Sequence, residues 1–225
     1  MSKSALDFAK HFINREYDHP RNTFDGNMKL QKMLYFSQLI HLATRGEKLF
    51  EDNMYAFKNG TVIESVRQRY RNNTIEFIHE SSQSEIAFNE PEMESVSLAE
   101  RIFGDLDAQT LSDLNHQQRS WISCFERSKD DFVDGYYHKE LSVIEAEDIM
   151  ALDLDNIREV IDAFYEQSEG SDTVEVFEIV NGKKFYYNPS EIYIDEPVLE
   201  ILQNFNGEES VYSIYKDENN SYVIF

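Results

Sequence analysis

Few side chains of this 225-residue sequence have the types and spacing that chemistry requires. Asp113 and His116 are three residues apart, which would place two potential metal ligands on one face of a helix. The spacing supplies no third ligand, so we predict no metal site. Cys124 together with His116 suggests a nucleophile and its base. Cys124 also follows Trp121 in a helical stripe, which favours a buried and unreactive thiol.

The remaining chemical signals are equally sparse. The glycines do not form a phosphate-binding loop, and no nucleotide-binding, kinase or serine-nucleophile pattern occurs. A lone histidine on an apolar helix face, such as His41, is usually a hydrogen-bonded core residue. We therefore predict no catalytic residues and no cofactor, and expect that the protein is not an enzyme.

A small group of basic residues lies around positions 58–71. It could contact a phosphate backbone, or it could neutralise neighbouring carboxylates in a very acidic chain. The group consists of Lys58, Arg67, Arg69 and Arg71.

The net charge of −22, from 43 acidic and 21 basic residues, argues against ordinary nucleic-acid binding, which needs a basic surface. Such a charge would steer a basic protein partner toward the chain. It could equally serve solubility alone. The hydrophobic fraction of 41% is sufficient for a packed core and argues against global disorder.

The sequence also indicates a compartment. A single cysteine, Cys124, excludes an intrachain disulfide and suits a reducing environment. The first residues lack the apolar core of a signal peptide, and no apolar run approaches the roughly 20 residues of a membrane span. We expect a cytoplasmic protein without a membrane segment.

One long apolar helix must position most of these residues. From residue 28, apolar side chains recur at helical spacing and cover more than half of the cylinder, so neighbouring elements must surround it. Asn27 is expected to cap this helix and Gly46 to end it. Asn59 and Gly60 then predict a tight turn, and Thr61 is expected to cap a second helix over residues 62–71, with Glu64 as the capping-box partner.

This stretch, with a second one downstream, resembles a known family. K-L-Q-K-x-L-Y-F-x-Q-x-x-H-L, then A-F-K-N-G-T-V-I, and later L-S-D-L-N-H-Q-Q-R-S-W are similar to the motifs of the Panacea domain. This is the SocA-like antitoxin domain, which also occurs in phage-associated proteins. Phe57 replaces the tryptophan usual in the family, and Thr61 replaces a proline. The matching motif residues are Lys29, Leu30, Gln31, Lys32, Leu34, Tyr35, His41, Gly60, His116 and Trp121.

The rest of the sequence completes an α+β fold. Helices are expected over residues 4–16, 98–103, 108–114 and 121–127, and from Ser142 as a cap, with a short strand at 74–78 and a loop at 80–94. Beyond residue 150 the patterns predict helices at 155–167 and 197–205, and strands at 174–180, 183–187, 191–194, 211–215 and 221–225.

A change in composition suggests two domains. Residues 1–150 hold 26 acidic and 17 basic residues, and residues 151–225 hold 17 acidic and 4 basic residues. We predict a mainly helical Panacea-like domain over residues 1–150, containing a small β element. An acidic α+β extension with β-hairpins is predicted over residues 151–225.

The resemblance implies a non-enzymatic antitoxin that binds and neutralises a cognate toxin protein, with a further role as an adaptor for a ClpXP-type protease. The alternative is a phage or mobile-element protein that mimics nucleic acid and blocks a host nucleic-acid-binding protein. For partner contact we single out the segment around the Asn-Gly turn, because its rings and its exposed loop suit an interface. The candidate partner-binding residues are Tyr55, Phe57, Lys58, Asn59, Thr61 and Arg67.

Overall fold

The computed structural model describes residues 3–84, 86–131, 133, 135–170, 176–188, 192, 194, 196–207, 209–217 and 221–225. Its internal contacts divide the chain into two units, Met1–Asp162 and Ala163–Phe225. Helix α8 (Leu154–Gly170) spans this division. The helices and small β-sheets of both units give an α+β fold, as predicted.

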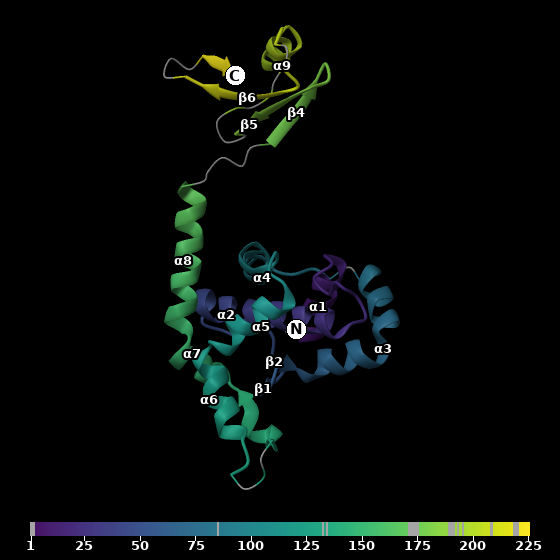
Figure 1. Cartoon of the computed structure of the whole chain (residues 1–225), viewed down its shortest axis with the longest axis vertical. Coiled ribbons are helices and arrows are strands. Elements are labelled where there is room, and N and C mark those ends of the chain that lie inside the picture. The colour runs from purple at the N-terminus through teal and green to yellow at the C-terminus, as the bar shows by residue number, and fades with distance from the viewer. Residues whose placement is uncertain are drawn as a thin grey trace. The chain divides into compact units, whose positions relative to one another are not determined.

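The first unit is built around α2 (Phe24–Arg45), in which every residue from 30 to 43 is buried. Figure 1 shows α2 among the other helices of this unit, and it packs against α1, α3, α4, α5 and α7. The predicted central helix is therefore confirmed. The other helices of this unit before α8 are α1 (Ala5–Asn14), α3 (Glu64–Ser82), α4 (Glu90–Phe103), α5 (Ala108–His116), α6 (Arg119–Ser128), the 3-10 helix η1 (Lys139–Ser142) and α7 (Ala146–Leu152).

The start of α2 differs from the prediction. Thr23, not Asn27, is the N-cap: its backbone is extended, and its Oγ1 accepts a hydrogen bond from Gly26 N at 3.0 Å. Asn27 lies inside the first turns, where its side chain accepts from Gln31 Nε2. The end is as predicted, because Gly46 adopts φ +74° and its N–H donates to Leu42 O.

The segment after the Asn-Gly turn was wrongly predicted as helix from residue 62. Thr61 lies in a strand, and β1 (Met54–Phe57) pairs with β2 (Gly60–Ile63) as an antiparallel hairpin. Helix α3 begins only at Glu64. The local capping signal at Thr61 is overridden because residues 60–63 pair with β1, and the N–H groups of Thr61 and Ile63 donate to the side chains of Asn115 and Gln31. A third strand, β3 (Val143–Ile144), adds to the other edge of β1.

The strand predicted at residues 74–78 is also wrong. Helix α3 continues through this segment after a kink at Asn73, where φ is −141°. Thr74, Phe77 and Ser81 are buried at helical spacing, and α3 packs along α1. Packing of this face against α1 outweighs the β preference of the isolated residues.

Two predicted helix starts were also misplaced. Residues 80–94 are not mainly loop, because α4 already begins at Glu90 with a capping box between Asn89 and Glu92. Ser142 caps no helix. It ends η1, and the capping box of α7 is formed by Glu145 and Asp148 instead. Ser4 and Asp107 are the N-caps of α1 and α5.

The second unit contains a four-stranded sheet of order β4-β5-β6-β7 and the helix α9 (Glu196–Gln203). The strands β4 (Val176–Val180), β5 (Lys183–Tyr187), β6 (Val211–Lys216) and β7 (Tyr222–Ile224) agree with the predicted hairpins. Strands β5 and β6, which precede and follow α9 in the sequence, run parallel. The hydrophobic core of the second unit includes Phe185, Val198, Leu202 and Tyr212. The predicted strand at 191–194 lies partly outside the described residues.

None of the helices in the described part of the chain has the length and hydropathy needed to cross a membrane.

Candidate functional site

The β1–β2 hairpin is held in place by side chains from the central helix. Gln31 Oε1 accepts a hydrogen bond from Ile63 N at 2.7 Å, and Lys32 Nζ donates to Thr61 O at 3.0 Å. Both side chains are buried. They belong to the K-L-Q-K motif, so this motif anchors strand β2 to α2.

Side chains from α5 and α6 hold the same hairpin from the other direction. Asn115 accepts from Thr61 N, and its Nδ2 donates to Thr61 Oγ1 at 3.0 Å. Ser112 Oγ donates to Asn59 O at 3.2 Å, and Trp121 Nε1 donates to Phe57 O at 3.2 Å. The separated motif segments therefore converge on the backbone of one hairpin.

Gly60 allows this convergence. Its φ of +93° is a conformation that residues with a side chain rarely adopt. A Cβ added at this position would lie 2.5 Å from Lys32 Nζ and would also overlap Asn115 Oδ1. Only glycine lets the turn approach both α2 and α5 this closely.

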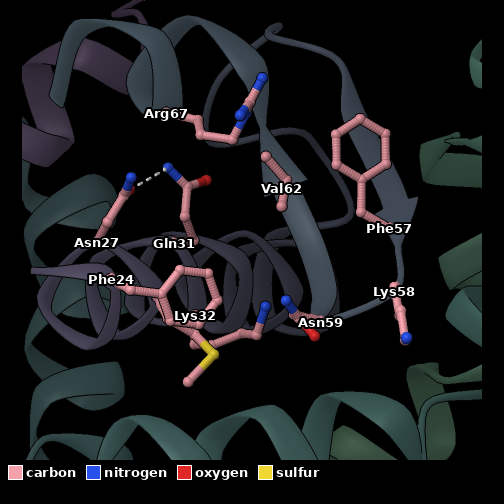
Figure 2. A pocket seen from close by; sticks show the side chains of 10 residues that line it. Phe24, Asn27, Gln31, Lys32, Phe57, Lys58, Asn59, Val62 and Arg67 are labelled. Carbon is pink, nitrogen blue, oxygen red and sulfur yellow. Dashed lines mark hydrogen bonds between the residues drawn. The ribbon is translucent and has the colours of Figure 1, made fainter. Parts of the chain in front are cut away.

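A pocket of about 230 Å³ lies between the hairpin and the starts of α2 and α3. Figure 2 shows Gln31 and Lys32 reaching from α2 toward the hairpin, with Val62 and Arg67 on the facing side. Lys32 is only 1% exposed, and burial lowers the pKa of its ammonium group to about 7. The lining residues are Phe24, Asn27, Met28, Gln31, Lys32, Phe57, Lys58, Asn59, Val62 and Arg67.

Four of the six candidate partner-binding residues reach the surface of the hairpin. The rings of Tyr55 and Phe57 are partly exposed, with centroids 5.8 Å apart, and Lys139 Nζ lies 4.7 Å from the centroid of Tyr55. Lys58 and Asn59 are exposed in the turn. Together the four form the hairpin surface, defined as Tyr55, Phe57, Lys58 and Asn59.

The other two candidates are placed differently. Thr61 is fully buried and faces Asn115, so its side chain does not reach the surface. Arg67 is paired with Glu64 at 2.7 Å and 2.8 Å, and this pair lowers the pKa of the Glu64 carboxyl to about 2. Arg69 similarly pairs with acidic residues of α3. For these two arginines, the structure supports neutralisation of neighbouring carboxylates.

The motif histidines have structural contacts. His41 Nδ1 lies 2.9 Å from Ser95 Oγ and links α2 to α4. The ring of His116 packs on Trp121 at 4.4 Å. Burial lowers the pKa of both histidines, which disfavours their charged forms.

Cys124 is buried, and its contacts are with Asp148 and Arg127. Burial raises the pKa of this thiol to about 11, which leaves it protonated at neutral pH and a weak nucleophile. Within the described residues, no group of three His, Cys, Asp or Glu side chains could hold a metal ion.

Sequence reasoning missed two residues that anchor the hairpin, Ser112 and Asn115. Asn115 directly precedes the motif residue His116, but an asparagine near a helix end gives no signal that distinguishes a long-range anchor from an ordinary polar residue. Their partners, Asn59 and Thr61, lie more than 50 positions away.

The segment that anchors the hairpin matches a known protein family. Residues 30–122 match the family model described as antitoxin SocA-like, Panacea domain. The match runs from Leu30 within α2, through the hairpin, to the start of α6, and it confirms the resemblance found in the motifs. The family suggests an antitoxin-like role and a protein toxin as partner. Neither the curated proteins nor the solved structures gave a significant match to this chain.

Proposed function

We propose that this protein is a non-enzymatic cytoplasmic antitoxin that binds a protein toxin directly and neutralises it. The observation that carries the proposal is the anchoring of one short hairpin by side chains from three helices. Gln31, Lys32, Asn115 and Trp121 all bind its backbone. In this proposal the motif residues maintain a surface element for protein binding.

An anchored hairpin suits protein binding because little conformational freedom is lost when a partner docks. The hairpin surface combines two neighbouring rings with a lysine, and aromatic and cationic side chains often dominate interface energies. We therefore propose the hairpin surface as the toxin-binding element. The side chains of Lys58 and Asn59 can vary in type without loss of the anchoring contact from Ser112, which uses the backbone oxygen of Asn59. Partner specificity can change in this way while the fold is kept.

A role as an adaptor that delivers the toxin to a ClpXP-type protease is a finer part of the proposal. It is supported by the resemblance to the SocA-like branch. If toxin levels in cells fall when the antitoxin and the protease are both present, and do not fall without the protease, neutralisation proceeds by degradation. Unchanged toxin levels with full rescue of growth would indicate blocking instead.

The decisive test is co-expression with the product of the neighbouring gene. We expect the neighbour to stop growth alone and the wild-type chain to restore it. Tyr55→Ala combined with Lys58→Glu should abolish rescue and weaken toxin binding about tenfold or more, as expected for interface anchors. Ile75→Ala is a matched control, because Ile75 is 82% exposed on α3, outside the hairpin.

Circular dichroism melting would establish that these variants are folded. A folded hairpin variant with unchanged rescue would show that the hairpin surface is not the toxin contact. A wild-type chain that fails to restore growth against a toxic neighbour would contradict neutralisation of that partner.

The charge of the chain favours a second candidate function, mimicry of nucleic acid. Ala163–Phe225 alone contains 13 acidic and 3 basic residues, a net charge of −10. A host nucleic-acid-binding protein captured by the full chain, and released by DNA in competition, would support this function. Capture that DNA does not affect would argue against it.

A further inference from the structure

Lys32 is a buried cation whose charge is not balanced. Its ammonium group has three N–H donors, and Thr61 O accepts from one of them. No carboxylate pairs with it in the described part of the chain, and none lines the pocket into which it projects. This is unexpected in a chain with 43 acidic residues.

Anchoring the hairpin does not require a charge. A neutral amide could donate the same hydrogen bond to Thr61 O, just as the side-chain amide of Asn115 donates to the Thr61 hydroxyl. Burying an ammonium group without a counter-charge is costly, and the lowered pKa of Lys32 reflects that cost. An anion bound in the pocket would offset most of this free-energy cost.

We propose that this pocket is a binding site for a carboxylate carried on a short apolar stem. Lys32 binds the carboxylate, and the side-chain amide of Asn59 in the turn supplies a further donor. Phe24, Met28 and Val62 line the pocket and contact the stem. A volume of about 230 Å³ is below the range of drug-sized or cofactor sites, so it suits a small group.

The charges favour a monoanion over a phosphate. Arg67 lines the pocket, but its guanidinium is already neutralised by Glu64. Lys58 is exposed, so solvent screens its charge. Among the described residues that line the pocket, Lys32 is therefore the single effective cation, and a dianion would retain an unbalanced charge beside apolar walls.

Two sources share this chemistry: a small organic acid, and a glutamate side chain presented by another protein. The inference does not depend on the proposed antitoxin role, because it concerns the pocket itself. If the ligand is a glutamate of the toxin, this pocket would form part of the proposed toxin-binding site.

The test uses the full chain labelled with ¹³C at lysine Cε, with NMR titration of Lys32 in the presence of hexanoate. Bound hexanoate should raise the pKa of Lys32 by about one unit or more, as a close opposite charge does. Hexanamide, which has the same stem without the charge, should leave it unchanged, as should an equal concentration of sodium chloride. No change with hexanoate, or an equal change with hexanamide, would overturn the proposal.

Variants test the same point by binding. Lys32→Met should weaken hexanoate binding about tenfold or more, the value of a hydrogen bond to a charged group. Lys10→Met is the matched control, because Lys10 is a partly exposed lysine on α1 that does not line the pocket. Equal binding by a folded Lys32→Met variant would exclude Lys32 as the recognition group. The wild-type titration decides the matter if this variant does not fold.

The two sources are separated with peptides. A capped Ala-Ala-Glu-Ala-Ala peptide and its glutamine counterpart are titrated in the same way. A pKa change with the glutamate peptide alone supports a protein side chain as the ligand. A change with hexanoate and with neither peptide supports a small acid.

Discussion

Lys32 should control how the stability of the first unit depends on pH. Its pKa is about 7 when folded and 10.5 when unfolded, so between these values the unfolded chain holds a proton that the folded chain lacks. The free energy of unfolding should therefore rise with pH from 7 to 10.5, with a slope approaching about 1.4 kcal/mol per pH unit. Below pH 7 the group is protonated in both states, and its contribution no longer changes.

Urea unfolding at pH 7.5, 8.5 and 9.5 would measure this slope. The fluorescence of Trp121 reports on the first unit, because it is the one tryptophan of the sequence. The slope of the wild-type chain should exceed that of Lys32→Met by about 1 kcal/mol per pH unit. Equal slopes would mean that Lys32 keeps an ordinary pKa.

Asn115 is the second residue on which the hairpin depends. Asn115→Ala leaves the buried Thr61 N–H and hydroxyl without their partner, so we expect a loss of about 2–3 kcal/mol in unfolding free energy. Asp113→Ala, on the exposed side of the same helix, should cost at most about 0.5 kcal/mol. Similar losses for both variants would argue against a special role for the Asn115 contacts.

At the scale of elements, the turn of the hairpin is the most constrained point. Gly46, at the end of α2, serves for comparison, because its φ is +74° but the space around it is open. Gly46→Ala should lower the free energy of unfolding by about 1–2 kcal/mol. Gly60→Ala combines a positive φ with overlap on Lys32 and Asn115, so its cost should reach about 3 kcal/mol or more. Thermal melting of the two variants compares backbone strain alone, in Gly46→Ala, with backbone strain plus steric overlap, in Gly60→Ala. A Gly60→Ala variant as stable as Gly46→Ala would show that the hairpin can move away from α2.

For the whole molecule, the two units should be separable. The core of the first unit is formed by its own helices, so a chain of residues 1–170, which keeps α8 complete, should melt within a few degrees of the full chain by Trp121 fluorescence. Removing the acidic remainder should also slow association with a basic toxin and weaken its salt dependence, because steering depends on net charge. An unchanged association rate and salt dependence would remove any role of the second unit in toxin capture.

Local patterns in the sequence were sufficient for the elements that depend on neighbouring residues. The apolar spacing of α2, the Gly46 stop, the Asn59-Gly60 turn and the hairpins of the second unit all follow from periodicity and turn chemistry. The motifs also identified the Panacea domain. They did not reveal what the motif residues do, because Lys32 and Asn115 act on backbone atoms far away in the chain.

The tertiary structure decided the outcomes where local and long-range preferences compete. Residues 60–63 became a strand because they pair with β1 while side chains of α2 and α5 bind the backbone of Thr61 and Ile63, although Thr61 is a good local cap. Residues 74–78 became helix because Phe77 packs in the interface with α1. Composition alone determined the acidic character of the chain. The joining of Gln31, Lys32, Asn115 and Trp121 around one hairpin required folding, since hydrogen bonds between distant segments leave no periodic signal in the sequence.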